Sequence, residues 1–288
     1  MGTIQSHTSQ GQTGRGAGTK LSTGRNWGTP SNREEPTSHW SVFSFWGFFG
    51  HAADIRCRRV TGDPRDAARE AAAAAAADRI EPGMTIGLGS GRAVWKVVDE
   101  IGRRRLSVRA AAASVRTEEL AAQAGIELVE LDNAGPLDLA IDGADEIDPQ
   151  LGLIKGAGGA LLREKLVIAA ARHFVVVAET DKKVERLGEH RPVPVEVVRF
   201  GWRSTQTRLL DGVVPDAELR LAGDSPYVTD EGHVILDCKV PADGSIEELA
   251  AALKSETGVV EHGFFLGMAD EVLLGTLDGN VEELSLPA

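Results

Sequence analysis

Residues 141–165 read IDGADEIDPQLGLIKGAGGALLREK and are the most informative stretch of the chain. They place four acidic residues within seven positions, then a lysine in a glycine-rich run, then another acid. Acidic side chains this close repel one another, and glycine costs backbone entropy on folding. The acids lie at the carboxyl end of a predicted strand, where open α/β sheets bind ligands. The stretch therefore predicts a strand, a binding loop and a helix in succession.

Strands and helices alternate on both sides of this stretch. Helices are predicted at 63–80, 92–104, 116–125 and 160–173, and strands at 84–91, 107–114, 126–131, 137–142 and 174–179. Alanine, the best helix former, dominates the first helix, and Asp63 and Pro64 suit its start. The last strand, FVVVAE, is continuously apolar, which is typical of strands buried on both faces of a parallel sheet. The alternation predicts an α/β fold, with a Rossmann-like, mostly parallel sheet and helices on both faces.

The rhythm changes after Arg191. Strands are predicted at 192–198, 217–221, 234–240 and 259–265, and helices at 203–210 and 245–254. This order predicts a smaller α+β (ferredoxin-like) lid subdomain at 191–263. EVLLGTLDG at 271–279 is predicted to return as the last strand of the first sheet. The Rossmann-like catalytic domain would then comprise 63–190 and be completed by 264–288.

Residues 1–62 differ in composition from the rest. They are rich in Gly, Ser, Thr and Asn, show no sustained period, and carry seven Lys/Arg against three Asp/Glu. The apolar run HWSVFSFWGFFG, at 39–50, comes too late for a secretory signal. We expect a disordered leader, a cloning remnant or a start-site extension. The alternative is a short amphipathic anchor or partner-binding element.

Composition excludes several function classes. The net charge of −12, with no basic stripe, argues against nucleic-acid binding, but a local cationic pocket could still hold a small anion. The sequence contains no run of about 18 apolar residues, so no membrane span is predicted. The two cysteines, Cys57 and Cys238, form neither CxxC nor a metal-binding spacing. We therefore expect a cytoplasmic protein with no membrane or nucleic-acid partner.

A glycine loop, GLGSG at 87–91, lies between a predicted strand and helix. Backbone N–H groups at a helix start bind anions. The loop completes neither the dinucleotide-binding GxGxxG nor the Walker motif. Ser90 and Arg92 favour phosphate, because a hydroxyl and a guanidinium both suit it. The alternative is a tight turn without a ligand.

The 141–165 stretch supplies the candidate chemistry. Asp142, Asp145 and Glu146 follow the strand, Lys155 and the glycine amides lie beyond, and Glu164 is on the next helix. Two carboxylates and an ammonium around a glycine-lined cleft suit proton transfer beside a carbonyl group.

Two other interpretations compete for these acids. Acid clusters often bind Ca²⁺ or Mg²⁺, but DGADEID does not fit the EF-hand loop, and Lys155 would oppose a cation. We therefore predict no metal. Taken alone, Glu164 would be a solvated helix acid or a partner of Arg163 or Lys165.

The stretch DGADEIDPQLGLIKGAGGALLREK resembles the signature of type A ribose-5-phosphate isomerases. MTIGLGSG is similar to the phosphate loop of that family, and VVVAETDKKVERLG resembles its strand and following turn. PVPVEVVRFGW and GFFLGMADEVLLGTLDG resemble its lid region and C-terminal strand. The resemblance runs from about Asp63 to the end and leaves out the leader.

The resemblance implies an aldose-ketose isomerase of the pentose phosphate pathway that interconverts ribose 5-phosphate and ribulose 5-phosphate through an enediolate. Glu164 would be the general base, Lys155 would stabilise the enediolate, and Asp142 would assist ring opening. The substrate-binding residues would be Ser90, Gly91, Arg92, Ala93 and Arg69 near the phosphate, and Asp145, Gly156, Ala157, Gly158 and Lys182 elsewhere. The family implies no metal, no organic cofactor and a homodimer or homotetramer.

The chain departs from the family pattern at four positions. Arg92 and Ala93 stand where the family usually has Ser or Thr, which removes hydroxyl donors from the phosphate loop. Ala157 replaces a frequent glycine, which requires a negative φ there. Asp181 replaces a common serine. These changes affect phosphate affinity and sugar preference more than the type of reaction.

Other functions stay open on sequence grounds. One is a non-catalytic sugar-phosphate-binding module, such as the effector domain of a regulator, although no helix-turn-helix is evident. Another is an isomerase of a different aldose phosphate. A CoA-transferase-like relative and a flavin or nicotinamide oxidoreductase are the remaining alternatives.

Overall fold

The predicted alternation forms a seven-stranded sheet in the computed structural model, which describes residue 63 and residues 65–286. The strand order is β16-β15-β7-β4-β1-β2-β3, and all neighbours are parallel except β15 and β16. The strands are β1 (Thr85–Leu88), β2 (Arg109–Ala112), β3 (Glu127–Leu128), β4 (Leu139–Asp142), β7 (Phe174–Glu179), β15 (Glu271–Gly275) and β16 (Val281–Ser285). The return of β15 beside β7 confirms that the stretch at 271–279 joins the first sheet. Contrary to the prediction, it is not the last strand, because β16 follows it and pairs with it at the edge of the sheet.

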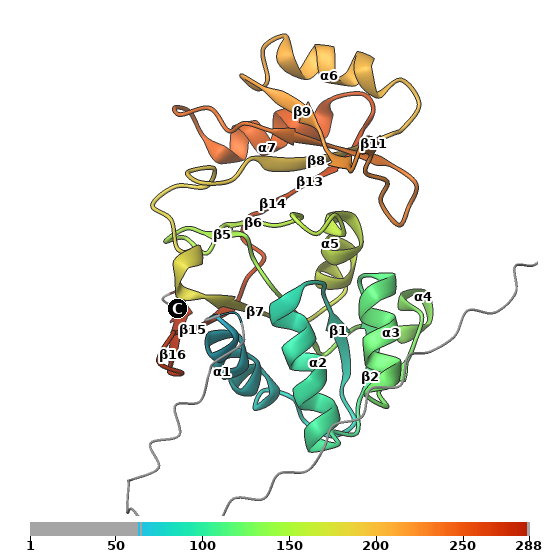
Figure 1. Cartoon of the computed structure of the whole chain (residues 1–288), viewed down its shortest axis with the longest axis vertical. Coiled ribbons are helices and arrows are strands. Elements are labelled where there is room, and N and C mark those ends of the chain that lie inside the picture. Colours follow the sequence, from blue (N-terminus) through green and yellow to red (C-terminus); the bar gives the residue numbers. More distant parts are fainter. Residues whose placement is uncertain (1–62, 64, 287–288) are drawn as a thin grey trace, which may run out of the picture. The chain divides into compact units, whose positions relative to one another are not determined.

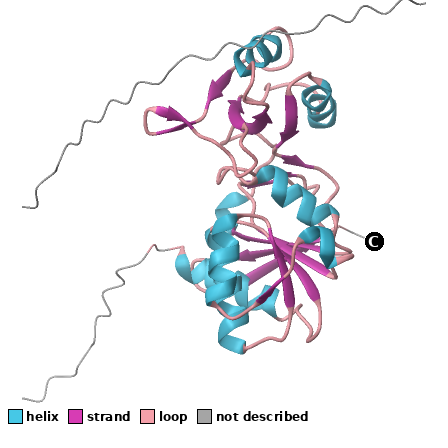
Figure 2. Ribbon diagram, turned by 90° about the vertical axis from the view of Figure 1, so that its right-hand side faces the viewer, coloured by secondary structure: helices cyan, strands magenta, loops and turns pink. Residues whose placement is uncertain are grey.

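Helices cover both faces of this sheet (Figures 1 and 2). On one face lie α1 (Asp66–Ala77), α2 (Arg92–Arg104) and α3 (Val115–Gln123); on the other lie α4 (Leu131–Ala134) and α5 (Leu161–Ala169). The continuous apolar run of β7 follows from its burial, because alternate residues pack into the hydrophobic cores on the two faces of the sheet. Val175 and Val177 pack with α1 and α2, whereas Val176 and Ala178 pack on the opposite face. The predicted α/β class with two covered faces is confirmed.

The second half of the chain forms a four-stranded antiparallel sheet, β13-β8-β12-β9. Its elements are β8 (Val193–Val197), α6 (Trp202–Leu210), β9 (Ala217–Leu219), β12 (Val234–Cys238), α7 (Ile246–Ser255) and β13 (Val259–His262). This βαββαβ order is ferredoxin-like, as predicted. A hairpin of β10 (Leu221–Ala222) and β11 (Ser225–Pro226) connects β9 to β12. We call these elements, from β8 to β13, the lid (Figure 1). All described residues belong to one compact unit, so the subdomain boundaries stay a prediction.

A third sheet was not predicted. It pairs β5 (Glu146–Ile147) with β6 (Leu153–Ile154), and β6 with β14 (Phe264–Phe265), all antiparallel. The single strand predicted at 259–265 is divided at Gly263 between β13 and β14. A Cβ atom on Gly263 would lie 2.3 Å from the carbonyl oxygen of Lys155, so the chain crosses there only as glycine.

Several element bounds differ from the prediction. The first helix spans Asp66–Ala77 rather than 63–80, and α4 begins where the 126–131 strand was expected to end. A short 3₁₀ helix, η1 (Thr180–Lys182), follows β7. Pro64 and the leader, 1–62, lie outside the described residues, so the interpretations of the leader stay predictions. Nowhere in residues 65–286 does a helix reach the length and apolarity needed to cross a membrane.

Candidate active site

A cleft of about 260 Å³ opens at the carboxyl ends of β1, β4 and β7. All but one of the predicted site residues line it; the exception, Asp142, is buried and contacts Lys155, which does line it. The lining residues from the prediction are Arg69, Ser90, Gly91, Arg92, Ala93, Asp145, Lys155, Gly156, Ala157, Gly158, Glu164 and Lys182. Trp95, Ala144 and Glu179 also line the cleft and were not predicted. Tertiary structure thus brings together residues that lie up to 113 positions apart, from Arg69 to Lys182.

Lys155, directly after β6, is the centre of the cluster. Its ammonium lies 2.8 Å from Oδ2 of Asp142 and 3.2 Å from Oε2 of Glu164, and it donates to the carbonyl of Gly143 at 2.7 Å. Its side chain is only 3% exposed. Burial lowers the pKa of Lys155, but the two carboxylates more than offset this, and the net shift is upward. The lysine is therefore charged throughout the physiological range.

Asp142 ends β4, and the glycine loop is built around its carboxylate. Oδ1 accepts hydrogen bonds from the backbone N–H groups of Ser90 (3.2 Å) and Gly143 (2.7 Å). A Cβ atom on Gly89 would lie 1.8 Å from the Asp142 carboxyl carbon, so only glycine fits there. Burial raises the pKa of Asp142, and Lys155 opposes that rise. This loop therefore positions a carboxylate as well as approaching the cleft.

Glu164 lies in the first turn of α5, and its side chain is 4% exposed. Its contact with Lys155 lacks hydrogen-bond geometry, and no donor among the described residues bonds to Oε2. Burial raises the pKa of Glu164 to about 8, the charge of Asp142 adds to the rise, and Lys155 reduces it. A carboxylate with a raised pKa and an unbonded oxygen beside a cleft can accept a proton from carbon.

The other acids of the 141–165 stretch serve the backbone. Asp145 accepts from the N–H of Ala157 at 2.9 Å. Asp148 accepts from the N–H groups of Gln150 and Gly152 and closes the turn between β5 and β6. Glu146 is 1% exposed and accepts three backbone N–H bonds, at 2.6 to 2.7 Å, from Gly188, His190 and Arg191. These three acids therefore bind backbone N–H groups of the chain. Glu146 was expected beside Asp145 at the ligand end, but it instead binds the segment that leads into β8.

The loop of residues 156–159 forms a turn, with the N–H of Gly159 donating to the carbonyl of Gly156 at 3.0 Å. Ala157 is not among the residues with positive φ, so the backbone there suits alanine. Two lid residues that the sequence analysis did not identify, Arg220 and Tyr227, bond to carbonyls of this loop. No local signal could reveal them, because they lie more than 60 residues away along the chain.

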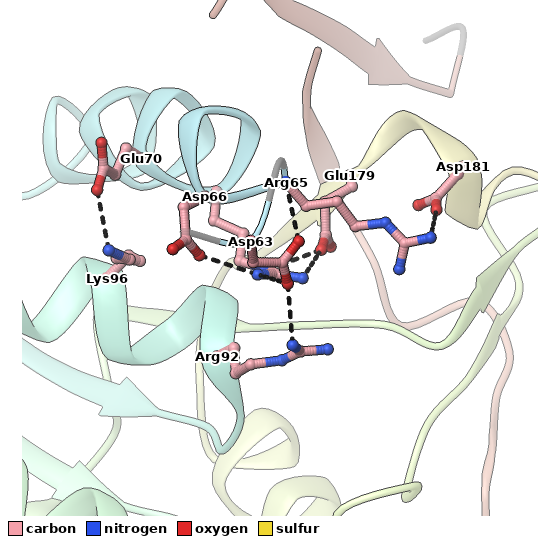
Figure 3. A network of polar contacts seen from close by, with 9 residues as sticks. Asp63, Arg65, Asp66, Glu70, Arg92, Lys96, Glu179 and Asp181 are labelled. Atoms are coloured by element: carbon pink, nitrogen blue, oxygen red, sulfur yellow. Dashed lines mark hydrogen bonds and ion pairs between the residues drawn. The ribbon is translucent and has the colours of Figure 1, made fainter. Parts of the chain in front are cut away.

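The end of the cleft near α2 carries a network of opposite charges (Figure 3). Arg69 is 2% exposed and bonds to Glu179 (2.7 Å), Asp63 (2.8 Å) and Asp66 (3.0 Å). Arg92 begins α2, is 66% exposed, and contacts the same Oδ2 atom of Asp63 at 3.1 Å. Arg69 is therefore neutralised by buried and half-buried carboxylates, whereas Arg92 has one shared partner.

Lys182 lines the cleft from η1 and makes no ion pair with any described residue. Its neighbour Asp181 is paired instead with Arg65 at 2.9 Å, at the start of α1 (Figure 3). The helix N-terminus of α2 faces the same end of the cleft through Gly91. Lys182, Arg92 and the α2 amides together form a cationic end that suits an anion.

Known proteins resemble this chain in sequence. The family model for ribose 5-phosphate isomerase A (phosphoriboisomerase A) matches residues 109–279. Ribose-5-phosphate isomerase A of Ruegeria pomeroyi is 46% identical over 235 residues, which cover 77% of this chain and 89% of that protein.

Solved structures agree. The chain aligns with ribose 5-phosphate isomerase A from Methanocaldococcus jannaschii at a TM-score of 0.72 and 35% identity, covering 78% of this chain and all of the other. A D-ribose-5-phosphate isomerase in complex with phospho-erythronic acid aligns at a TM-score of 0.71 and 34% identity, covering 76% of this chain and 97% of the other.

Proposed function

The chain belongs to the ribose 5-phosphate isomerase A family and is an isomerase, and on that premise we propose that it interconverts D-ribose 5-phosphate and D-ribulose 5-phosphate through an enediolate. The observation that carries the mechanism is the buried cluster of Asp142, Lys155 and Glu164 beside the cleft. The reaction belongs to the non-oxidative branch of the pentose phosphate pathway.

Glu164 is the proposed general base. It removes the proton from C2 of the open-chain aldose and returns it to C1, while a proton moves from O2 to O1. The intermediate enediolate carries negative charge on oxygen, which Lys155 and a glycine-loop amide stabilise. Asp142 holds Lys155 and assists ring opening. Every charge that this scheme requires is present in the chain, so the proposed reaction requires no added metal or organic cofactor.

The cationic end of the cleft is the proposed phosphate site. The amides of Gly91 and Ala93, at the start of α2, provide the anion site typical of a helix N-terminus. Lys182 and Arg92 provide charge. Arg69 contributes less, because Asp63, Asp66 and Glu179 already bind its guanidinium.

The pH profile should report the raised pKa of Glu164. Only the deprotonated carboxylate can accept the C2 proton, and burial holds that pKa at about 8. We therefore expect kcat/KM for ribose 5-phosphate to increase about tenfold per pH unit below that value and to level off above it. An initial-rate series from pH 5 to 9.5 tests this. A profile that is already flat from pH 5.5 upward would show that the base has an ordinary carboxyl pKa.

Arg92→Ala should weaken phosphate binding more than it slows turnover. Because Arg92 is exposed and shares Asp63, we expect KM to increase about three- to tenfold and kcat to change less than twofold. Asp63→Asn should have the opposite effect on KM, since it frees Arg92. Arg103→Ala is the matched control, because Arg103 is an exposed arginine of α2 paired with Glu100 and outside the cleft. An unchanged KM in Arg92→Ala would show that Arg92 points away from the phosphate.

The direct test of function is interconversion of ribose 5-phosphate and ribulose 5-phosphate by the purified protein, with EDTA present and no cofactor added. Turnover under these conditions supports the proposal. If turnover is absent but ribose 5-phosphate still raises the melting temperature, the chain is a sugar-phosphate-binding module or acts on another aldose phosphate. Turnover that depends on added metal would contradict the proposed mechanism.

We further propose a cytoplasmic homodimer or homotetramer, as the family implies. Light scattering coupled to size-exclusion chromatography tests the assembly, and a monomer at micromolar concentration would contradict it.

A further inference from the structure

Two lid residues hold three consecutive carbonyl groups of the loop at 156–159. Arg220 Nη1 donates to the carbonyls of Gly156 (2.7 Å) and Ala157 (3.1 Å), and the Tyr227 hydroxyl donates to that of Gly158 (3.1 Å). Arg220 connects β9 to β10, and Tyr227 follows β11. The lid is therefore bound to this loop through three hydrogen bonds.

Arg220 is itself held rigidly. The Asp237 carboxylate, on β12, accepts from Nε at 2.9 Å and also from Nη2. The N–H of Arg220 donates to the carbonyl of Ile235, and its carbonyl accepts from the N–H of Tyr227. The guanidinium is a planar fork, so fixing Nε and Nη2 also fixes the direction of Nη1. Arg220 therefore transmits the position of the lid sheet to the loop.

These hydrogen bonds to the carbonyl groups determine where the N–H groups of the loop point. The carbonyl and N–H of one trans peptide unit point in opposite directions, so the N–H of Gly158 faces away from Arg220. Gly158 lines the cleft and Arg220 does not. The N–H of Ala157 donates to Asp145, and that of Gly159 donates to Gly156. The N–H groups of Gly156 and Gly158 have no acceptor among the described residues, and of these two only that of Gly158 shares a peptide unit with a carbonyl that Arg220 binds.

We propose that Arg220, braced by Asp237, is a positioning residue that keeps the Gly158 amide aimed at the oxygen that becomes negative in the enediolate. This inference rests on the proposed function. Without the Arg220 fork, the peptide unit between Ala157 and Gly158 can rotate, and the donor is then no longer preorganised. A donor aimed at developing charge acts mainly in the transition state, so its loss lowers kcat rather than raising KM.

The test measures kcat, KM and melting temperature for Arg220→Ala, Arg220→Lys and Tyr227→Phe. We expect Arg220→Ala to lower kcat about 10- to 100-fold with KM changed less than threefold. Arg220→Lys should recover part of kcat, because an ammonium can still donate to one carbonyl. Tyr227→Phe, which removes one hydroxyl, should lower kcat by about two- to tenfold. If Arg220→Ala does not fold, the other two variants decide the question.

Arg208→Ala is the matched control. Arg208, on α6 of the lid, also bonds to a carboxylate, Glu256, and to a backbone carbonyl, that of Thr257, but it does not line the cleft. We expect it to keep wild-type kcat. If kcat of the Arg220 variants matches that of Arg208→Ala, or if Arg220→Ala raises KM with unchanged kcat, the positioning role is wrong. The proposed function fails separately, through a wild-type protein that does not convert ribose 5-phosphate.

Binding of phospho-erythronic acid, followed by thermal shift, provides a second readout. The compound carries both a phosphate and a carboxylate, so it senses the anion donors at both ends of the cleft. Arg220→Ala should weaken its binding more than that of inorganic phosphate, which senses only the cationic end. Equal weakening of both ligands would indicate general damage to the cleft and would contradict the proposal.

Discussion

Glu164→Gln is expected to lower turnover of ribose 5-phosphate by about two to four orders of magnitude while KM changes little. The amide has nearly the shape of the carboxylate but cannot accept a proton from C2. The side chain is 4% exposed and its Oε2 lies 3.2 Å from the Lys155 ammonium, so the substitution should preserve the surroundings of the site. Initial rates over a range of substrate concentrations measure both constants.

Glu261→Gln is the matched control for that variant. Glu261 is another buried carboxylate that pairs with lysines, at 2.9 Å from Lys165 and 2.7 Å from Lys254, but it does not line the cleft. We expect its turnover to stay within a few-fold of wild type. Near-normal activity in Glu164→Gln would remove Glu164 from the role of base.

Glu164→Gln should also change the stability of the fold in a pH-dependent way. The pKa of Glu164 is raised from 4.5 to about 8 in the folded chain. A raised carboxyl pKa means that the folded state binds the proton more tightly than the unfolded state, so this stabilisation is complete below pH 4.5 and is lost as pH rises to about 8. Glutamine stays neutral and avoids that loss. Melting temperatures of wild type and Glu164→Gln should be similar at pH 4.5, and the variant should be the more stable at pH 9.

Lys155→Met is expected to lower turnover by about three orders of magnitude and also to destabilise the fold. The ammonium is the only cation within 4 Å of Asp142 and Glu164 among the described residues, so it supports both the enediolate and the two buried carboxylates. Breaking a buried ion pair typically costs about 3 to 5 kcal/mol. Without the lysine the pKa values of both carboxyls increase further, so the destabilisation should grow with pH. Thermal unfolding at pH 5 and pH 8 measures this difference.

Lys165→Met separates chemistry from stability. Lys165 is also largely buried and bonds to Glu261 and to the carbonyls of His262 and Phe264. Its ammonium also lies 4.6 Å from the centre of the Phe265 ring, whose other near ammonium is that of Lys155, at 5.4 Å. We expect this variant to lose stability but to retain turnover per folded molecule. If Lys155→Met and Lys165→Met have equal residual activity, Lys155 has no specific role in the reaction.

The strongest elements were predictable from sequence because their signals are local. The α2 bounds match the prediction, since Val94, Val97, Val98 and Ile101 repeat on one face of the helix and all four are buried. β7 also matches, because burial on both faces requires an unbroken apolar run. The βαββαβ order of the lid followed from the spacing of its strands and helices.

The candidate site was predictable only in part. The pattern of acids, lysine and glycines located the cleft, but the role of Glu164 came from the family resemblance, since a helix acid is usually solvated. Glu146 was placed with the ligand-end acids, whereas the fold uses it to bind three backbone N–H groups. The sequence does not distinguish an acidic residue that faces a ligand from one that binds the backbone, because only the contacts made in the folded chain differ.

By itself, the sequence determined the alternating α/β architecture, the ferredoxin-like lid and most of the residues around the cleft. Tertiary structure decided the rest: the sheet of β5, β6 and β14, the shared bond of Arg69 and Arg92 to Asp63, and the grip of Arg220 on the glycine loop. The physical reason is one of range. Helix and strand periods arise between residues a few positions apart, whereas two-residue strands, ion pairs and the direction of an amide depend on groups that only folding brings within hydrogen-bond distance.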